Sequence, residues 1–373
     1  MRITDIEAII LRLPEVDAVR CDGTQDTLLI RVHTDEGMTG IGEVDSSPLV
    51  CKAVIDAPPS HSIATGIRSL LVGENPLEIG RLWEKMFEGT IYFGRSGPAL
   101  HAMSGVDQAL WDILGQATGL PIVALLGGAH HPRLQAYASA LMPDSPAEAA
   151  AMAEGYARQG YRAVKFGWGS IGRDPRLDEE LVRAIRSAVG EGIDIMIDAG
   201  QAWDLKAALR MATVYERYGI SWLEEPLHPD DFAGYRELCS RTTIPIAAGE
   251  QESSWLAFER LVDEAGLDVV QPDLGRCGGF TGGKRIAAHT HARRKRLVPH
   301  AFKSGVLLAA SAHFAAALPN GGMVEYTVST SPIARDLAID PVDFADGIVT
   351  IPPGRAGLGV ELDEGVLQRF RVA

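Results

Sequence analysis

Six acidic or imidazole side chains recur along this chain at nearly even spacing, and most of them close a short apolar run. Steps of 23 to 27 residues separate them: Asp198, Glu224, Glu250, Asp273, His300 and Glu325. Such a step is the length of one β-strand, one loop and one helix. In a parallel barrel, the C-terminal ends of the strands meet at one mouth, where the active sites of such barrels lie. The pattern therefore predicts a barrel with one site at its strand ends.

The composition is that of a folded chain with a large core. Its 373 residues suffice for one large and one smaller domain, and 46% hydrophobic content excludes disorder. The chain starts like a strand, without a targeting segment, and its four cysteines lack paired spacing. It contains no apolar run of membrane-spanning length. We therefore expect a cytoplasmic protein without a membrane partner. The formal charge of −14 argues against a nucleic-acid partner.

The N-terminal third reads as strands followed by helices. Residues 3–45 alternate in strand fashion, with a hairpin signal at Asp35-Glu36-Gly37. From about residue 63 to 118 the apolar residues adopt helical spacing. The clearest helix is expected to start at Ser104 and to end before Gly119. Strands and helices that do not alternate indicate an α+β module.

From about residue 134 strands and helices alternate. Ser145-Pro-Ala-Glu is a capping box that opens one of the helices. Apolar runs near residues 135, 163, 195, 221, 246, 269, 297 and 323 predict eight strands. The tail from Gly347 onward is expected to pack back on the N-terminal module.

Three carboxylates fall on the third, fourth and fifth of these strands: Asp198, Glu224 and Glu250. Adjacent strands lie about 5 Å apart, so the three negative charges would crowd together. A divalent cation removes this repulsion, and an all-oxygen ligand set suits magnesium better than zinc. Any one acid alone could equally cap a helix or face solvent, but three in register favour a metal site. Glu225 is expected to point to the opposite face of its strand, and it is assigned either a structural role or a role in supporting the metal ligands.

His300 ends the seventh strand and Asp273 the sixth, so their side chains are expected to touch. A carboxylate bonded to an imidazole fixes its tautomer and raises its basicity, as a general base requires. The alternative for a lone histidine is a packed core residue. Five further histidines lie in a loop or in helical stretches and are interpreted as solvated or packed: His130, His131, His289, His291 and His313.

Several longer motifs carry a family pattern. They include the segment from Ser104 to Ala117 with Gly119-Leu-Pro, Trp222-Leu-Glu-Glu-Pro, Ala248-Gly-Glu, Gln271-Pro-Asp with Gly278-Gly, and Gly357-Leu-Gly-Val-Glu-Leu. Together they make the chain resemble the mandelate racemase branch of the enolase superfamily over nearly its whole length.

The resemblance implies an α/β fold, a modified TIM barrel of (β/α)7β type with an α+β capping domain. Residues 1–126 would form the capping domain, 127–345 the barrel, and 346–373 a segment packed back on the capping domain. Magnesium would be held by the three carboxylates, and a small-molecule carboxylate would lose its α-proton to give an enediolate. His300 with Asp273 matches the family's base dyad. Glu325 matches the acid that hydrogen-bonds a substrate carboxylate oxygen.

The second strand departs from the family pattern. Members that act from both faces of the substrate carry Lys-x-Lys there, whereas this chain reads Val164-Lys165-Phe166-Gly167. A second departure is Gly200, where the family often has asparagine. Racemisation needs a base on each face, whereas elimination of water needs one base and one acid. His300 could supply both, with Lys165 neutralising the carboxylate or the intermediate.

The sequence therefore predicts a magnesium-dependent dehydratase of an acid sugar, giving a 2-keto-3-deoxy acid. The alternatives are a racemase or epimerase that uses His300 with an unidentified partner such as Lys165, and a catalytically silent homologue that binds a sugar acid. Candidate lid segments are Pro14–Thr27 with Arg20, Ser46–Ser62 with His61, and the segment from Tyr92 to Arg95. Arg20 and Trp168 are taken as substrate-binding, Lys303 as a possible pocket residue, and a homo-oligomer is expected.

Overall fold

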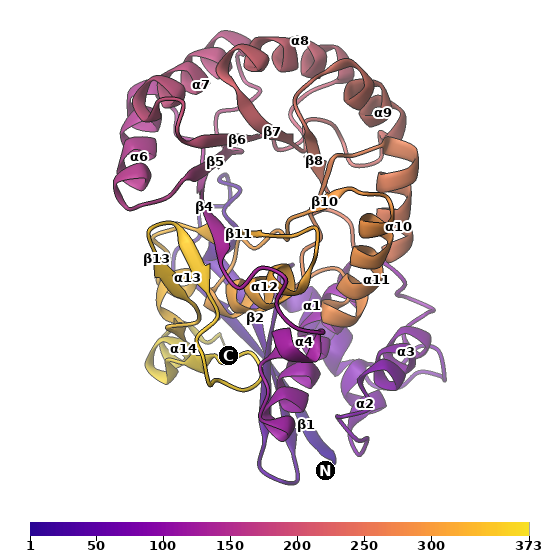
Figure 1. Ribbon diagram of the computed structural model, residues 1–373. Coiled ribbons are helices and arrows are strands. Elements are labelled where there is room, and N and C mark those ends of the chain that lie inside the picture. The colour runs from indigo at the N-terminus through magenta and orange to yellow at the C-terminus, as the bar shows by residue number, and fades with distance from the viewer. Residues whose placement is uncertain (373) are drawn as a thin grey trace.

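The computed structural model, which describes residues 1–372, consists of a barrel and a smaller domain docked against it (Figure 1). The ring of strands lies inside a ring of helices, and long indigo strands of the N-terminal part run below it. The architecture is the expected α/β fold with an N-terminal capping domain.

The capping domain begins with the antiparallel sheet β1-β2-β3. Its strands are β1 (Ile3–Arg12), β2 (Asp26–Thr34) and β3 (Thr39–Val44), and the predicted hairpin turn joins the last two. Its helices are α1 (Pro48–Asp56), α2 (Ile67–Leu71), α3 (Ile79–Gly89), α4 (Pro98–Thr118) and α5 (Ile122–Leu125). Helix α4 lies close to β3, because a Cβ built on Gly42 would stand 2.0 Å from the Gly105 carbonyl oxygen. Only glycine fits there.

Two local expectations in this domain are wrong. Helix α4 starts at Pro98 rather than at Ser104, with proline in its first turn after Gly97. The Ser104 hydroxyl is buried inside the helix, where it donates to the Leu100 carbonyl at 2.7 Å. The second candidate lid, Ser46–Ser62, is not a free loop, because α1 occupies most of it.

The barrel has the predicted eight strands within the described residues, each at its expected place. They are β4 (Leu134–Leu141), β5 (Ala163–Gly167), β6 (Asp194–Asp198), β7 (Ile220–Glu224), β8 (Ile246–Ala248), β9 (Val269–Val270), β10 (Arg296–Leu297) and β11 (Met323–Thr327). Consecutive strands pair in parallel from β4 to β10, and β11 pairs with β4. Ser145 caps α6 as expected, since its hydroxyl accepts from the Glu148 amide at 3.3 Å; this is one of the two bonds of the predicted capping box.

Seven helices connect these strands in the (β/α)7β order. They are α6 (Pro146–Arg158), α7 (Pro175–Val189), α8 (Leu205–Tyr215), α9 (Phe232–Arg241), α10 (Trp255–Arg260), α11 (Gly279–Ala292) and α12 (Gly305–Ala317). The barrel interior is filled by one buried side chain from each strand or its extension: Tyr137, Ala163, Met196, Trp222, Ala247, Val269, Val298 and Met323. The Arg296 guanidinium carbon lies 5.5 Å from the centroid of the Trp222 ring. The barrel is therefore a packed core, and only its ends are open to ligands.

The C-terminal elements are α13 (Pro332–Asp336), β12 (Ala338–Ile339), β13 (Asp343–Ala345), β14 (Ile348–Thr350), β15 (Glu361–Leu362) and α14 (Glu364–Phe370). The end of the tail packs on the capping domain, where the Leu358 amide donates to Asp112 at 2.8 Å and Arg371 pairs with Leu11. The expectation for the start of this segment is wrong, since β14 pairs with the barrel strand β4. No helix within residues 1–372 is long and apolar enough to cross a membrane.

Candidate active site

The three predicted metal ligands come together at the C-terminal ends of neighbouring strands. Asp198 and Glu224 are the last residues of β6 and β7 and lie side by side in register, and Glu250 follows β8. One carboxylate oxygen of each lies within 4.8 Å of the other two, and all three side chains are buried. Burial raises the pKa of Asp198 well above its ordinary value, and the charges of Glu224 and Glu250 raise it further. Lys165 offsets part of this repulsion, and a divalent cation bound at the cluster would offset more of it.

The donor set fits a hard divalent cation. All the candidate ligand atoms are carboxylate oxygens, as magnesium prefers. Asp198 already has one oxygen engaged, since its Oδ1 accepts from the Gly200 amide at 2.9 Å. Glu250 Oε1 accepts from Gln251 at 3.2 Å, whereas its buried Oε2 makes no hydrogen bond among residues 1–372 and lies 3.2 Å from His300 Nε2. Gly200, the departure from the family pattern, thus orients Asp198 through its backbone.

Glu225 directly follows Glu224 in the sequence, and it lies beside the carboxylate cluster rather than in it. Its backbone has a positive φ of 39°, which turns the chain at the end of β7. Its carboxylate accepts from Gln201 at 3.2 Å and from the Gly249 amide at 3.5 Å. Burial raises its pKa, as does the charge of Glu250. These bonds tie together the loops that follow β6, β7 and β8.

Lys165 is a buried cation rather than a surface lysine. It lies on β5, and its Nζ is 2.5 Å from Glu224 Oε1 and 2.8 Å from Glu325 Oε1. Burial alone would lower its pKa, but the charges of Glu224 and Glu325 raise it well above the ordinary value. Glu325 also accepts from Ser139 and from the Ala301 amide. Burial opposes its ionisation, yet Lys165 and His300 lower its pKa to about 2. At neutral pH the pair is therefore ionised.

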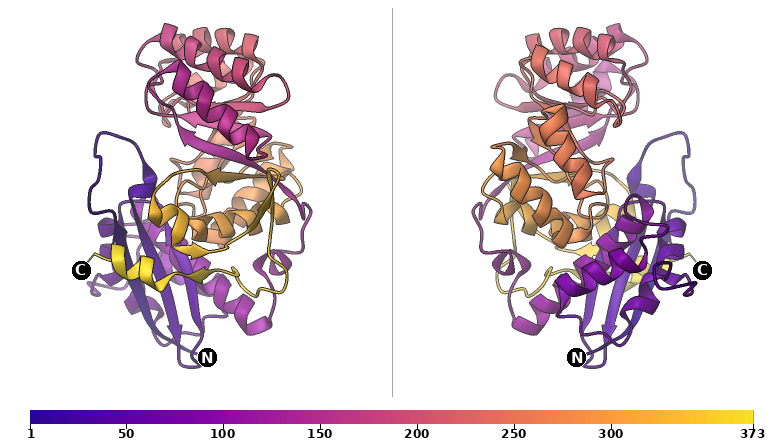
Figure 2. Two further views of the ribbon diagram at one scale, coloured as in Figure 1. Left: turned by 90° about the vertical axis from the view of Figure 1, so that its left-hand side faces the viewer. Right: turned by 90° about the vertical axis from the view of Figure 1, so that its right-hand side faces the viewer.

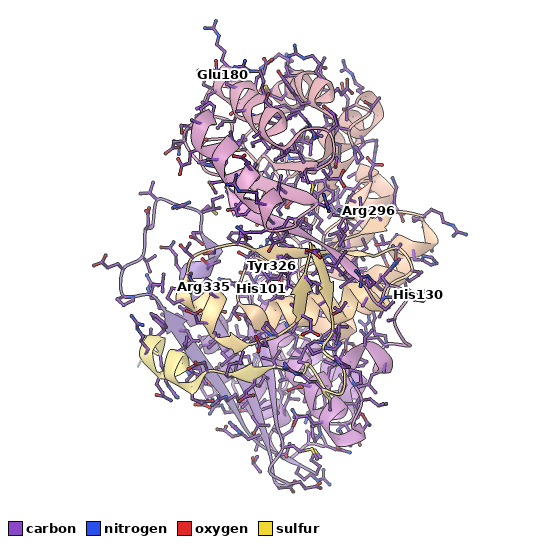
Figure 3. All side chains as sticks on the ribbon, turned by 60° about the vertical axis from the view of Figure 1, so that its left-hand side comes forward. His101, His130, Glu180, Arg296, Tyr326 and Arg335 are labelled. Atoms are coloured by element: carbon purple, nitrogen blue, oxygen red, sulfur yellow. The ribbon has the colours of Figure 1, made fainter. Side chains whose placement is uncertain are left out.

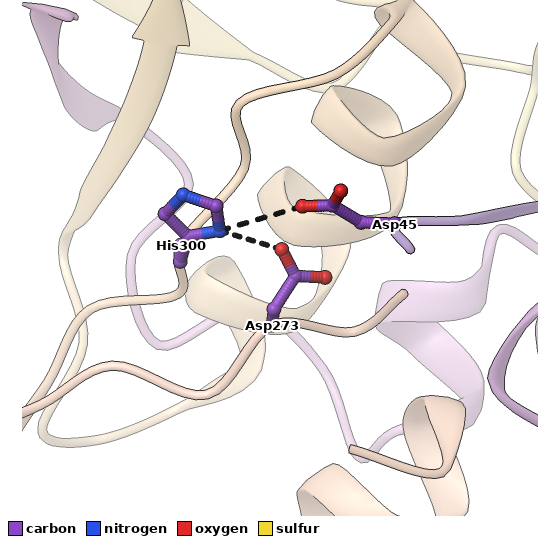
Figure 4. Close-up of side chains that lie close together, drawn as sticks. All are labelled: Asp45, Asp273 and His300. Atoms are coloured by element: carbon purple, nitrogen blue, oxygen red, sulfur yellow. Dashed lines mark hydrogen bonds and ion pairs between the residues drawn. The ribbon is translucent and has the colours of Figure 1, made fainter. Parts of the chain in front are cut away.

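His300 and Asp273 are in contact, as their positions in the sequence predict. His300 Nδ1 and Asp273 Oδ2 are 2.6 Å apart (Figure 4). The other ring nitrogen, Nε2, is 3.2 Å from Glu250 Oε2. Burial would lower the pKa of His300, but Glu250, Glu325 and Asp273 together raise it to about 10. The imidazole thus lies between the dyad carboxylate and the metal cluster, where it could exchange protons with a molecule bound at that cluster.

A third carboxylate at the dyad was not predicted from the sequence. Asp45 follows β3 of the capping domain, and its Oδ2 is 3.9 Å from His300 Nδ1 (Figure 4). Arg276 donates to this Oδ2 at 2.9 Å and to the Glu250 carbonyl at 2.8 Å. The only sequence signal for Asp45 was its position at the end of an apolar strand. Its partner lies 231 residues away, on the other domain.

Gly167 lies at the end of β5, in register with Asp198. A Cβ built on it would stand 2.4 Å from Asp198 Cβ and 2.9 Å from Asp198 Oδ2. The glycine therefore does more than omit a second lysine. Its missing side chain makes room for the carboxylate of Asp198.

A cavity of about 250 Å³ joins these groups. It is lined by Cys21, Gly23, Asp45, Ser139, Ala140, Leu141, Lys165, Gly167, Trp168, Asp198, Glu250, Gln251, Arg276, His300, Phe302 and Glu325. The predicted residue Trp168 is thus at the cavity. Arg20 is not among the lining residues and instead borders an adjacent hollow of about 620 Å³.

The remaining candidates have other positions. Lys303 is buried and donates to the Gly23 and Asp26 carbonyls, which fixes the base of the first lid segment to the barrel. In Figure 2 that indigo loop projects from the end of the capping sheet. His61 and Tyr92 pack against each other, with ring centroids 5.0 Å apart, and neither they nor Arg95 line the cavity. His130 is exposed at the edge of the molecule (Figure 3).

Two family models match this chain. The description "Mandelate racemase / muconate lactonizing enzyme, N-terminal domain" covers residues 3–127, and "Enolase C-terminal domain-like" covers residues 147–366. Among characterised relatives, the D-galactarolactone cycloisomerase of Agrobacterium fabrum is 30% identical over 92% of this chain and 91% of its own. The D-galactonate dehydratase of Ralstonia nicotianae is 31% identical over 93% and 91%.

Among solved structures, a racemase from Streptomyces coelicolor A3(2) with bound magnesium matches with a TM-score of 0.87. It is 27% identical, and the match covers 99% of this chain and all of the other.

Proposed function

Because the chain belongs to the mandelate racemase branch of the enolase superfamily, we propose that it is a magnesium-dependent acid-sugar dehydratase. Its substrate would be an aldonate or aldarate, and its product a 2-keto-3-deoxy acid. The relatives include both lyases and isomerases, so membership of the family supports an enzyme without deciding between these classes.

Magnesium would be held by Asp198, Glu224 and Glu250, whose mutual repulsion and carboxylate oxygens fit it. When bound, it would supply a Lewis acid that makes the proton next to the substrate carboxylate more acidic. Lys165 offers a donor to a substrate carboxylate or hydroxyl, and the ionised Glu325 beside it offers an acceptor. Trp168 provides an apolar wall of the cavity.

His300 is the proposed acid and base. The charge of Glu250 is the first of the causes that raise the pKa of His300, so a cation bound to Glu250 would lower that pKa and favour the neutral ring. The neutral imidazole takes the α-proton, and the electron pair of the broken C–H bond forms the double bond to the third carbon. The bond from that carbon to its hydroxyl breaks, and the imidazolium returns its proton so that the hydroxyl leaves as water. The resulting enol becomes the 2-keto acid. Asp273 holds the Nδ1 side of the ring, which leaves Nε2 directed at the reacting centre.

The observation that carries dehydration is the lack of a second base. Position 167 has no room for a side chain beside Asp198, and Lys165 is held as a cation between two carboxylates. A single imidazole suffices for syn elimination of water, whereas inversion at carbon needs groups on both faces.

An isomerase is the second candidate, because Lys165 lines the same cavity as His300. If binding of cation and substrate separated Lys165 from Glu224, its amine could act from the other face. A relative described as a cycloisomerase is consistent with such chemistry in the family.

One screen separates these functions. The protein is incubated with stereoisomeric aldonates and aldarates and Mg²⁺, and 2-keto acid is detected. Formation of 2-keto-3-deoxy acid is expected for at least one isomer. Exchange of the α-proton with D₂O without elimination would favour the isomerase, and silence with every substrate would count against both. The homo-oligomer remains a prediction, which light scattering on the purified protein tests.

A further inference from the structure

Glu224 is held more tightly than its two neighbours in the cluster. Its Oε2 accepts two side-chain hydrogen bonds, from Trp222 Nε1 at 2.9 Å and from Gln271 Nε2 at 2.7 Å. All three residues are buried, at 0% exposure for Glu224 and Trp222 and 1% for Gln271. Its other oxygen, Oε1, faces Lys165.

The two donors come from different strands. Trp222 lies two residues before Glu224 on β7, so the two side chains share a face of the strand. Its ring belongs to the packed interior of the barrel. Gln271 follows β9, and its amide reaches past β8 to the same oxygen. Both residues stand in motifs that marked the family resemblance but had no assigned role, Trp222-Leu-Glu-Glu-Pro and Gln271-Pro-Asp.

Each carboxylate of the cluster has one oxygen bonded by an N–H group of the protein, and in Glu224 the other oxygen, Oε1, faces the Lys165 ammonium. For Asp198 the engaged oxygen is bonded by a backbone amide. Only Glu224 has two buried side-chain N–H groups on one oxygen. Gln271 Oε1 has no hydrogen-bond partner among residues 1–372. Within these residues, the bond from Nε2 to Glu224 is therefore the one hydrogen bond that the Gln271 side chain makes.

We propose that Trp222 and Gln271 are positioning residues for the metal ligand Glu224: they hold Oε2 away from the cation and limit this ligand to Oε1. The inference rests on the proposed cation site. Partners that orient a metal ligand typically change metal affinity about 10–100-fold when they are removed.

The test measures Mn²⁺ binding by electron paramagnetic resonance, without substrate or turnover. Mn²⁺ is a hard cation with the same preference for oxygen ligands. Gln271→Met keeps the length of the side chain and removes the donor. The matched control is Gln108→Met. Gln108 is an equally buried glutamine, whose amide donates to the Glu43 and Leu274 carbonyls at the junction of the domains.

Gln271→Met is expected to weaken Mn²⁺ binding about 10–100-fold, while Gln108→Met keeps the affinity of the parent even if it lowers the unfolding temperature. Trp222→Phe, which removes the other donor, serves as the second variant if Gln271→Met does not fold. Equal affinities of parent and Gln271→Met, or equal losses in it and in the control, overturn the inference alone. Absence of Mn²⁺ binding by the parent overturns the cation site itself, and the proposed function with it.

Discussion

At the scale of single residues, the imidazole of His300 is the group on which the proposed chemistry depends. His300→Asn keeps a similar polar volume but cannot carry the proton, so turnover is expected to fall about 10²–10⁴-fold. Steady-state kinetics on the substrate found in the screen measures this. His228→Asn is the control, because His228 is 68% exposed and outside the cavity. Unchanged turnover in His300→Asn would remove this residue as the base.

Gly167 tests how closely the cluster is packed. Gly167→Ala places a Cβ only 2.4 Å from Asp198 Cβ. Overpacking of this kind costs about 1–3 kcal/mol of stability. We expect the aspartate to shift, which weakens Mn²⁺ binding and turnover. Gly192→Ala is the control, since an added Cβ there meets no atom within 4 Å. If both variants bind Mn²⁺ like the parent, position 167 tolerates a side chain and the argument against a second base weakens.

At the scale of elements, His313 of α12 ties three segments together. Its Nδ1 accepts from the Val123 amide at 3.1 Å, so its Nε2 carries the proton and donates to the Leu358 carbonyl at 3.2 Å. Burial lowers its pKa from 6.5 to about 4. Because folding lowers this pKa, the two bonds of the neutral His313 ring contribute fully to stability above about pH 6.5. That contribution is lost as the pH falls towards 4.

We therefore expect His313→Gln to be less stable than the parent at pH 7, by about 1–3 kcal/mol for the lost bonds. The difference should shrink at pH 4, because the parent then loses the same contribution. Denaturant unfolding at the two pH values measures this. A constant difference between parent and variant would show that His313 does not titrate in this interval.

The elements themselves were largely predictable, whereas their contacts were not. Most barrel strands could be located because their side chains form a short apolar run that is followed by a polar residue. The start of α4 could not, because a serine before an apolar run resembles an N-cap even when its hydroxyl bonds within the helix, as that of Ser104 does. The dyad of His300 with Asp273 followed from adjacent strands. The contact of Asp45 with Arg276 joins two domains, and no periodicity in the sequence encodes it.

At the scale of the whole molecule, the capping domain supplies part of the base site. Two acids near the end of strand β3, Glu43 within it and Asp45 directly after it, both reach the barrel, since residues two apart share one face of a strand. Glu43 accepts from Ser304 and from the Leu307 amide at the start of α12. Asp45 accepts from Arg276 beside His300. The contacts that dock the capping domain on the barrel therefore also place a carboxylate beside the proposed base.

Asp45→Asn tests this coupling. The variant keeps the shape of the side chain but leaves the Arg276 guanidinium, which is 19% exposed, without its carboxylate partner. Breaking a fully buried pair costs about 3–5 kcal/mol, and this partly buried pair should cost less. We expect a lower unfolding temperature together with lower turnover, because the carboxylate beside His300 is lost as well. Burial opposes ionisation of Asp45, but Arg276 and Lys303 hold its pKa below the ordinary value. The stabilisation is therefore present above the ordinary aspartate pKa of 3.8 and is lost as the pH falls further.

The control is Asp230→Asn, because the Asp230 side chain is 90% exposed. This variant should leave the unfolding temperature and the turnover unchanged. A stable Asp45→Asn with lower turnover would assign Asp45 to the chemistry alone. A destabilised variant with full turnover would assign it to docking alone. Only the joint loss supports a capping domain that completes the base, because both functions then depend on the same carboxylate.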